Sequence, residues 1–415
     1  MTFRCRIHRG AQQIGGSCIE LEAAGARILL DLGLPLDAAE ASDDLLPQIS
    51  GLQSADSTLR ALVVSHGHGD HWGLIPRIMP GLPLAMGAAT ARILHAAAPF
   101  VPAPFRPEVT HELFDRRALE IGPFKIIPYL VDHSAYDAYA LLIEARGRRL
   151  FYSGDIRGHG RKGGLFDKLI ASPPESVDAF LMEGSSLGRL GPEDQFPSEP
   201  QIEERLVERF NHPGFVAVSA SAQNIDRMVT LYRACKRTGR TLLLDLYALE
   251  ILKATGNANI PQAGWPNVKA YVPDYQRRQI KRNKRFDIID QYKPHRIFAE
   301  ALPEIGSKAV MLFRPAMMPD IDKADLWDGG RAIWSQWDGY LKDGVGAKLK
   351  ADLAARAVPL EVIHTSGHAS ILDLKRLAAA INPLALIPIH TFAGDDFSLH
   401  FQNVTRRLDG EWWGV

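Results

Sequence analysis

The sequence predicts a mixed α/β protein in which a parallel α/β unit is inserted into a strand-rich first domain. Residues 1–190 alternate short apolar runs with turns, and after a proline-containing connector strand-like runs alternate with helix-like stretches. Such alternation is typical of parallel sheets, because each crossover needs a dozen or more residues. At 415 residues the chain suits two domains. We expect a first domain formed by 1–195 and 359–415, interrupted by an inserted domain at 196–358.

Two β-hairpins are expected in the first half of the chain. Residues 18–22 and 27–31 form one candidate pair, and residues 139–144 and 149–152 form the other. Each pair is joined by a four-residue segment that contains glycine, as hairpins often are. Residues 178–183 give one more strand, which ends in an acidic residue.

The inserted domain is expected to alternate strands with helices, and its first helix begins near Ser198, with Pro200 close to the first helical position. Its expected strands are 215–218, 241–245, 308–313 and 331–334, and its expected helices are 224–237 and 246–254. After residue 360 the chain returns to polar, histidine-containing loops, with a helix at 371–380 and a strand before His390.

Composition narrows the class of protein. Lys plus Arg and Asp plus Glu balance at 48 each, so the whole-protein field gives no support for nucleic-acid binding, which would need a local patch. The three cysteines, Cys5, Cys18 and Cys235, are far apart, which is typical of a reduced, cytoplasmic protein. No signal peptide is apparent at the N-terminus, and no apolar run is long enough to span a membrane.

The segment His66-Gly67-His68-Gly69-Asp70-His71 carries most of the functional information. It follows an apolar strand-like run and precedes a helix-like stretch at 73–79. Buried His and Asp are costly unless they are hydrogen-bonded or bind metal. His66 and His68 can face one ion while Asp70 and His71 reach a second, and two such ions can share a hydroxide and hold a scissile phosphate or acyl group. The alternative is a surface loop that happens to be rich in histidine.

This segment resembles the metal-binding motif of the metallo-beta-lactamase superfamily. The resemblance implies a further His, a bridging Asp and a late His, each at a strand end. The sequence offers His133 after the run 124–127, Asp155 after the run 150–152, and His390 after the run 384–389. The resemblance then implies that His66, His68 and His133 hold one ion, that Asp70, His71 and His390 hold the other, and that Asp155 bridges them. Taken alone, His133 or His390 would more often be a hydrogen-bonded structural residue.

An insertion between the bridging Asp and the last His resembles the beta-CASP group of this superfamily, which cleaves nucleic acids and includes ribonuclease J. Glu183 stands where the group has an acidic motif, His368 lies in a loop similar to that of ribonuclease J, and His390 matches the last motif. The resemblance implies an αββα sandwich with an inserted parallel α/β domain. The chain departs from ribonuclease J at 313–318, where a Gly-Ser-rich loop is missing, and it ends without the C-terminal domain through which ribonuclease J dimerises.

The chemistry of these additional residues agrees with phosphodiester cleavage. The leaving oxygen needs a proton, and His368 is a suitable donor near neutral pH, with Glu183 to orient it. The backbone and hydroxyl groups around it, at Ser366, Gly367 and Ser370, are candidates for binding phosphate. The alternatives are that Ser370 simply caps the following helix and that Glu183 is an exposed strand-end acid.

Residues 277–285 contain six basic residues in nine. The spacing of Arg278, Arg282 and Arg285 predicts one helical face that could follow a nucleic-acid backbone, although a solvated helix face is an equal alternative. Trp334 and Trp337 are further candidates for base stacking, or else core aromatics.

Together these features predict a metal-dependent phosphodiesterase that hydrolyses RNA, as an endonuclease or a 5′-exonuclease, through a hydroxide that bridges two divalent ions. Zinc suits the His-rich ligands and manganese is the alternative. The expected catalytic residues are Asp70, Glu183 and His368. The expected partner is RNA rather than DNA, with no membrane association and with an oligomeric state that the sequence leaves open. The competing hypotheses are a hydrolase of DNA or of a small ester, lactone or thioester, and an RNA-binding subunit without activity.

Overall fold

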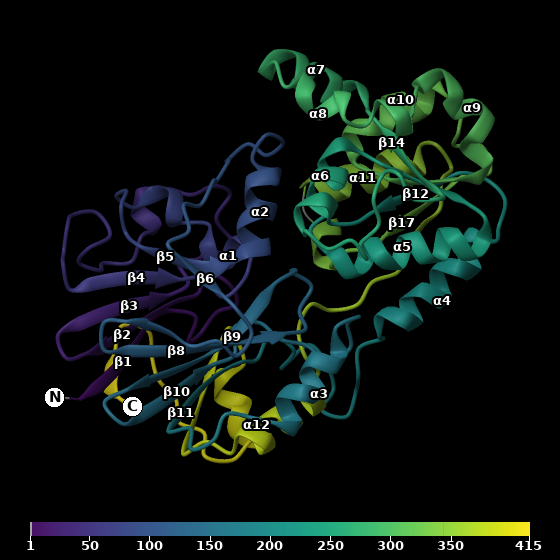
Figure 1. Ribbon diagram of the computed structural model, residues 1–415. Helices are drawn as coiled ribbons and strands as arrows, with labels where there is room; N and C mark the ends of the chain where they lie inside the picture. Colours follow the sequence, from purple (N-terminus) through teal and green to yellow (C-terminus); the bar gives the residue numbers. More distant parts are fainter. Residues whose placement is uncertain (1, 343) are drawn as a thin grey trace. The chain divides into compact units, whose positions relative to one another are not determined.

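The computed structural model describes residues 2–342 and 344–415, and the chain divides into two compact units (Figure 1). Unit 1 comprises the chain up to His95 together with Phe105–Phe196 and Gly367–Val415. Unit 2 comprises Ala96–Pro104 and Pro197–Ser366. The expected inserted unit is therefore recovered as a compact body, and it also takes in residues 96–104, which the sequence had assigned to the first domain.

Unit 1 is built on two packed sheets. The first has the strand order β20-β1-β2-β3-β4-β5-β6 and the second has the order β19-β11-β10-β9-β8-β7. Both expected hairpins form, as the antiparallel pairs β2–β3 and β9–β10. The strands of the first sheet are β1 Phe3–Arg9, β2 Cys18–Ala23, β3 Ala26–Leu30, β4 Leu59–Val63, β5 Leu84–Gly87, β6 His111–Leu113 and β20 Trp412–Gly414. Those of the second are β7 Leu119–Ile121, β8 Phe124–Val131, β9 Ala138–Ala145, β10 Arg148–Tyr152, β11 Ala179–Glu183 and β19 Ala385–Ile389.

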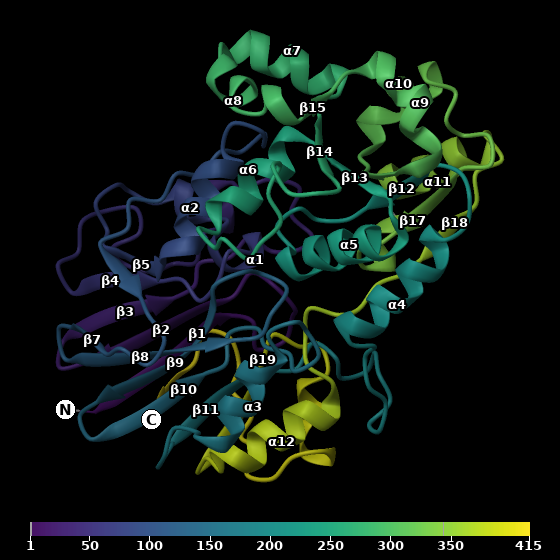
Figure 2. The same cartoon turned by 45° about the vertical axis from the view of Figure 1, so that its right-hand side comes forward.

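Apolar side chains fill three layers of unit 1. One cluster lies between the sheets, and it includes Ile7 and Ile28 from the first sheet and Leu141 and Ile387 from the second. A second cluster joins the outer face of the second sheet to the helices α3 (Gly163–Ala171) and α12 (Ile371–Ile381), which lie side by side (Figure 2). A third covers the outer face of the first sheet with the segments around α2 (Ala88–Ala97). Because both faces of each sheet are covered, a strand such as β9 reads as an almost continuous apolar run. The result confirms the expected αββα sandwich.

Unit 2 is a seven-stranded, wholly parallel sheet with the order β15-β14-β13-β16-β12-β17-β18. Its strands are β12 Val216–Ser219, β13 Thr241–Leu244, β14 Val268–Tyr271, β15 Arg296–Ile297, β16 Ala309–Leu312, β17 Arg331–Trp334 and β18 Leu360–Val362. Its helices are α4 Glu199–Phe210, α5 Ile225–Thr238, α6 Leu246–Ala254, α7 Asp274–Asn283, α8 Phe286–Asp290, α9 Leu302–Ile305, α10 Met318–Lys323 and α11 Gly344–Ala354. Single 3₁₀ turns, from both units, lie at Asp43–Leu45, Ile75–Arg77, Lys293–His295, Ala299–Ala301, Gly306–Lys308, Pro315–Met317, Asp338–Leu341 and Gly394–Leu399.

Local capping chemistry explains where the helices of unit 2 begin and end. Ser198 and Gln201 form a reciprocal capping box at the start of α4. The side chain of Asn224 caps α5, and Gly239, in the left-handed conformation with φ 68°, ends it. The carboxylate of Asp245 caps α6 by accepting a hydrogen bond from the backbone of Ala248.

Three details correct the sequence-based expectations. The helix-like stretch at 73–79 is replaced by the four-residue helix α1 (Gly69–Trp72), which begins inside the ligand segment, followed by a 3₁₀ turn. Strand β18 pairs with β17, and these hydrogen bonds keep residues 360–366 in unit 2 rather than in the returning segment. Helix α7 stops at Asn283 because Lys284 takes a left-handed conformation, so Arg285 lies beyond the helix and cannot share a helical face with Arg278 and Arg282.

No helix among residues 2–342 and 344–415 combines the length and the apolar character that crossing a bilayer requires.

Candidate metal centre

Strand ends of unit 1 bring the predicted ligands together. His66 follows β4, and Asp70 and His71 lie on the short helix α1. Asp155 and His390 follow β10 and β19, which flank β11 as parallel neighbours, so the carboxyl ends of these strands meet at one edge of the sheet. The fourth strand to contribute is β8, which ends two residues before His133. Residues more than 300 positions apart therefore share one buried site.

The ligand atoms form two groups that share one carboxylate. His66, His68, His133 and Asp155 make the first group, and Asp70, His71, Asp155 and His390 make the second, with the ligand atoms in each within 4.8 Å of one another. Within them, Asp155 Oδ2 lies 3.6 Å from His66 Nε2 and 3.3 Å from His71 Nε2. His390 Nε2 lies 3.3 Å from Asp70 Oδ2. A bridging carboxylate between two sets of nitrogen and oxygen donors is a common arrangement in dinuclear metal sites.

Unsatisfied polar atoms in this cluster fit a metal. His66 Nε2, His71 Nε2 and Asp155 Oδ1 are buried and have no hydrogen-bond partner among the described residues. His68 Nδ1 and His133 Nε2 face each other at 3.0 Å. Buried polar groups are rarely left unsatisfied, and a divalent cation would coordinate all of these atoms. The donor set of imidazoles and carboxylates suits zinc and also admits manganese.

The remaining nitrogen of each ligand imidazole is held by a hydrogen bond. His133 donates from Nδ1 to the carbonyl of Gly367 at 2.6 Å, and His390 donates from Nδ1 to Ser185 Oγ at 2.9 Å. His66 donates from Nδ1 to Ser65 Oγ at 3.0 Å. These bonds fix the tautomer and direct Nε2 of each ring toward the metal positions.

Asp31 is a functional residue that the sequence reasoning missed. It follows β3 with φ 60°, is fully buried, and accepts a hydrogen bond from His71 Nδ1 at 2.8 Å. The same carboxylate accepts bonds from the backbone and hydroxyl of Ser65, both at 2.7 Å, and from the Tyr152 hydroxyl at 2.6 Å. Asp31 therefore orients a metal ligand and ties two strands to the ligand segment. Its position at the end of an apolar run is the same signal that singled out Asp155.

A buried ion pair also links two ligand loops. Arg157 donates from its backbone to the carbonyl of Asp132 at 2.8 Å and from Nε to the Asp132 carboxylate at 3.3 Å. Both side chains are fully buried. Because Asp132 precedes His133 and Arg157 follows Asp155 by two residues, this pair holds the two ligands at a fixed separation.

Burial and neighbouring charges prepare the ligands for a cation. Burial lowers the pKa of His66 and His133 well below the usual value and keeps them neutral, the form that binds metal. Burial also opposes the charge on His71, but the carboxylates of Asp155 and Asp31 outweigh it and raise its pKa. Burial of Asp155 is likewise outweighed, by the surrounding imidazoles of His390 and His71, so its pKa is lowered.

Glu183 and His368 lie beside the two ligand groups. His368 Nδ1 is 3.2 Å from Glu183 Oε1, 3.2 Å from Ser185 Oγ and 3.9 Å from Asp155 Oδ2. Burial disfavours the charged imidazole, but Glu183 and Asp155 together raise the pKa of His368 to about 9. Glu183, His368 and His390 also lie close enough to share an ion, so this geometry permits His368 to act either as a proton donor or as a ligand.

The loop before α12 is organised around His133. A Cβ at Gly367 would lie 2.7 Å from Ser134 Oγ and 3.3 Å from His133 Cε1, so a side chain there would press on a ligand. The Ser370 hydroxyl accepts from the backbone of Asp373 at 3.1 Å and thereby caps α12, which was the structural alternative for this residue. Ser366 is the last residue of unit 2.

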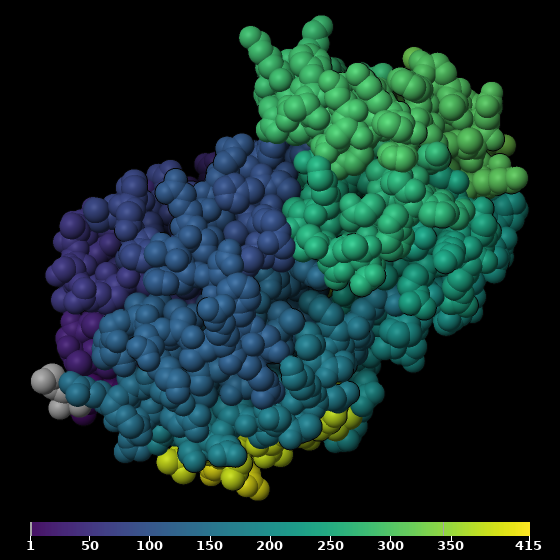
Figure 3. Space-filling view, viewed as in Figure 1, coloured from purple at the N-terminus to yellow at the C-terminus, as the bar shows by residue number. Residues whose placement is uncertain are grey.

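The basic residues of the predicted nucleic-acid patch all belong to unit 2. Arg278 is 77% exposed and pairs with Asp274 at 2.5 Å, and Arg285 pairs with Asp287 at 2.8 Å. Arg282 is exposed near the end of α7. Long side chains project from this part of the surface (Figure 3).

Comparison with known proteins agrees with this geometry. Residues 27–185 match the beta-lactamase superfamily domain. Ribonuclease J of Sinorhizobium meliloti is 25% identical over 382 residues, which cover 88% of this chain and 63% of that protein. Ribonuclease J of Mycolicibacterium smegmatis is 25% identical over 403 residues, covering 92% of this chain and 67% of that protein. The RNase J-like protein of Methanocaldococcus jannaschii is 26% identical over half of this chain.

A solved structure of the same fold is also known. The crystal structure of a protein of unknown function from Enterococcus faecalis superposes with a TM-score of 0.80 at 21% identity and covers 100% of both chains. The chain itself spans less than two thirds of the Sinorhizobium ribonuclease J. The matched domain, the sandwich fold, the shared-carboxylate cluster and the ribonuclease J relatives lead to one assignment: the chain belongs to the metallo-beta-lactamase superfamily, in its ribonuclease J-like beta-CASP group.

Proposed function

We propose that this chain is a metal-dependent phosphodiesterase that hydrolyses RNA. The observation that carries the proposal is the pair of ligand groups sharing Asp155, with His368 and Glu183 immediately beside them. Phosphodiester cleavage needs charge stabilisation, an activated water and a proton for the leaving oxygen, and this cluster offers a residue or a metal position for each need.

Two divalent ions would occupy the site, one held by His66, His68 and His133 and the other by Asp70, His71 and His390, with Asp155 between them. Bound ions of this kind supply Lewis acidity and an activated water at the scissile phosphate. Asp70 has a second task, because its carboxylate is 15% exposed and is the ligand best able to accept a proton from an incoming water.

His368 donates the proton to the leaving oxygen. Its Nδ1–H is engaged by Glu183 and Ser185, so the transferable proton sits on Nε2. The Glu183 carboxylate stabilises the protonated imidazole, and Glu183 is itself fixed by the backbone N–H groups of Ile156 at 3.2 Å and Ser185 at 3.1 Å. Glu183 is fully buried and thus acts through His368 rather than on the substrate.

RNA is the proposed substrate because the relatives that align along most of this chain are named ribonuclease J. The fold alone also hosts hydrolysis of other esters, so the assignment of substrate depends on those relatives rather than on the cluster.

The test compares four substrates with and without chelator. These are 5′-phosphorylated RNA, DNA of the same sequence, bis(p-nitrophenyl) phosphate and a lactone, each incubated with protein loaded with zinc or with manganese. We expect chelator-sensitive cleavage of RNA and of the small phosphodiester, and the sizes of the RNA products distinguish endonucleolytic from 5′-exonucleolytic cleavage. Turnover of the lactone without cleavage of either phosphodiester would overturn the proposal.

A further inference from the structure

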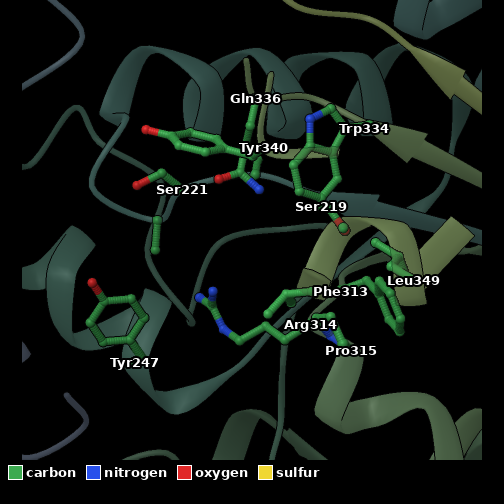
Figure 4. Close-up of a pocket in the computed structure, with 14 residues that line it drawn as sticks. Ser219, Ser221, Tyr247, Phe313, Arg314, Pro315, Trp334, Gln336, Tyr340 and Leu349 are labelled. Carbon is green, nitrogen blue, oxygen red and sulfur yellow. The ribbon is translucent and has the colours of Figure 1, made fainter. Parts of the chain in front are cut away.

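Unit 2 contains a cavity of about 420 Å³ that is separate from the ligand cluster, because every residue lining it belongs to unit 2 (Figure 4). It lies at the carboxyl ends of β12, β16 and β17, where Ser219, Phe313 and Trp334 leave the sheet. Strand order changes direction at this point, since β13 leads outward to β14 and β15 whereas β16 returns to lie between β13 and β12. Ligands of parallel α/β sheets bind at such positions, in cavities of this size.

The walls of the cavity are aromatic and its polar groups are few. Four rings line it, those of Tyr247, Phe313, Trp334 and Tyr340. Gln336 and the hydroxyls of Ser219 and Ser221 supply neutral donors and acceptors. In Figure 4 the guanidinium of Arg314 points into the space between Tyr247 and Ser221. Flat apolar walls with a few polar groups suit a planar heterocycle.

Arg314 has an unused donor in this cavity. Its Nε donates to the fully buried carboxylate of Asp245 at 2.7 Å, and its guanidinium lies 5.0 Å from the centre of the Tyr247 ring. Its Nη2 is buried and has no hydrogen-bond partner within residues 2–342 and 344–415. A buried donor of this kind costs free energy until an acceptor reaches it. The direction of the side chain is fixed by Asp245 and Tyr247, so the acceptor must come from a molecule in the cavity.

The charge of the cavity argues against a phosphate. Arg314 is the only charged side chain among the described lining residues, and Asp245 neutralises it. A phosphate would bring negative charge to a site with no net positive charge. A neutral ring that offers an acceptor to Arg314 and an edge to Gln336 meets no such penalty.

We propose that this cavity binds a nucleobase, either in a free nucleoside or as an unpaired base of an RNA strand. The base stacks on the aromatic walls and accepts a hydrogen bond from Arg314 Nη2. The free-nucleoside source is independent of the hydrolytic activity proposed above, whereas the RNA source rests on it.

The test titrates the full chain with guanosine and with uridine, followed by calorimetry and by the tryptophan fluorescence that Trp334 contributes to the cavity. We expect saturable binding of one nucleoside per chain. Arg314→Gln and Tyr340→Ala should each weaken it by about tenfold or more, the usual worth of one base contact or one stacking ring. Tyr340 is 50% exposed, so its removal leaves the fold intact.

Matched controls lie in the same unit. Arg356 pairs with Asp322 at 2.7 Å and is 30% exposed, close to the 27% of Arg314, and Phe298 is a ring that is 57% exposed outside the cavity. Arg356→Gln and Phe298→Ala should bind nucleoside as the unchanged protein does. The inference is overturned if neither nucleoside binds, if the controls weaken binding as much as the cavity variants, or if inorganic phosphate or ribose 5-phosphate competes as well as guanosine.

Two further arms separate the source of the base and the fate of the proposed function. Displacement of guanosine by single-stranded RNA but not by duplex RNA identifies a base in a strand, and no displacement by either identifies a free nucleoside. Asp155→Asn should abolish hydrolysis of bis(p-nitrophenyl) phosphate and leave guanosine binding unchanged. Loss of nucleoside binding with intact hydrolysis, or the reverse, therefore tells which of the two proposals has failed.

Discussion

The ligand cluster of unit 1 and the cavity of unit 2 are both built where strands end, yet they differ in how the chain supplies their residues. Four of the seven ligands of unit 1 come from the six-residue segment 66–71, and all of its ligands are imidazoles or carboxylates. The cavity draws on the loops after four strands, with mostly aromatic and neutral polar side chains. The first site suits ions and a charged reaction, and the second suits recognition of a neutral ring.

The largest expected effect is confined to unit 1 and would separate the two sites most clearly. Asp155→Asn removes the carboxylate shared by both ligand groups, so both ions should be lost, and with them hydrolysis of RNA and of bis(p-nitrophenyl) phosphate. Metal content after purification without chelator and steady-state rates are the measurements. Asp395→Asn, at a carboxylate that is 92% exposed, is the control and should keep both. Full metal content in the Asp155 variant would show that the shared-ligand arrangement is wrong.

The second effect tests whether His368 is a proton donor or a ligand. General acid catalysis is typically worth about 10²–10⁴ in rate, so His368→Ala should lower RNA turnover by that order while leaving the metal content unchanged. The loss should shrink with a p-nitrophenyl phosphodiester, because that leaving group departs without a proton. His390→Ala should instead lose an ion together with all activity. An ion lost from the His368 variant, or equal losses with both leaving groups, would assign His368 to the metal.

The difference between the two sites also explains how much the sequence could predict. The segment 66–71 announces itself because several ligands are consecutive, and His133, Asp155 and His390 each stand at the end of an apolar run. The hairpins over 18–31 and 139–152 follow from alternation and glycine turns. These signals are local, and local patterns are what a single sequence displays.

Features that depend on distant partners were not predictable. Asp31 was assigned only to the end of a hairpin strand, and nothing near it in the sequence points to His71 or Tyr152, which lie 40 and 121 residues away. The stripe of three arginines failed because Lys284 ends α7 one turn too early, a choice made by local backbone conformation that helical spacing does not contain. The orphan Nη2 of Arg314 depends on the pairing of residues 69 apart.

Asp31 provides the next prediction, of intermediate size. Asp31→Asn keeps the acceptor for Tyr152 but removes the charge that holds the Nδ1–H of His71, and partners of this kind typically contribute about 10–100-fold to metal affinity. Metal affinity measured by competition with a chromogenic chelator should fall by that factor. Asp167→Asn, which removes an exposed ion pair with Arg376, is the matched control. An unchanged affinity in the Asp31 variant would leave Asp31 with a purely structural role.

A shift in pH dependence is expected to be smaller and concerns the Glu183–His368 pair. Burial opposes protonation of His368, but the Glu183 carboxylate helps to raise its pKa to about 9, and the reaction needs the protonated ring. Activity should therefore fall as pH rises through this pKa, and Glu183→Gln, which removes the charge, should move the falling limb to lower pH. The measurement is the pH profile of kcat/KM for RNA. The same limb should be absent with the p-nitrophenyl substrate, and a limb that does not move on removing Glu183 would contradict the coupling.

The smallest expected effect belongs to the basic segment of unit 2. Replacing Arg278, Arg282 and Arg285 with Gln should weaken RNA binding and flatten its salt dependence by roughly 0.7 for each lost phosphate contact on a single strand. Two of the three arginines already pair with Asp274 and Asp287, so the total should lie between about 0.7 and 2, with little change in thermal stability. Arg233→Gln with Arg237→Gln on α5, at side chains that are 57% and 42% exposed and also pair with acids, is the matched control. Binding measured by fluorescence anisotropy over a series of salt concentrations gives the slope directly. If the segment variant and the control give the same slope as the unchanged protein, α7 is an ordinary solvated helix and the RNA must be held by other parts of the chain.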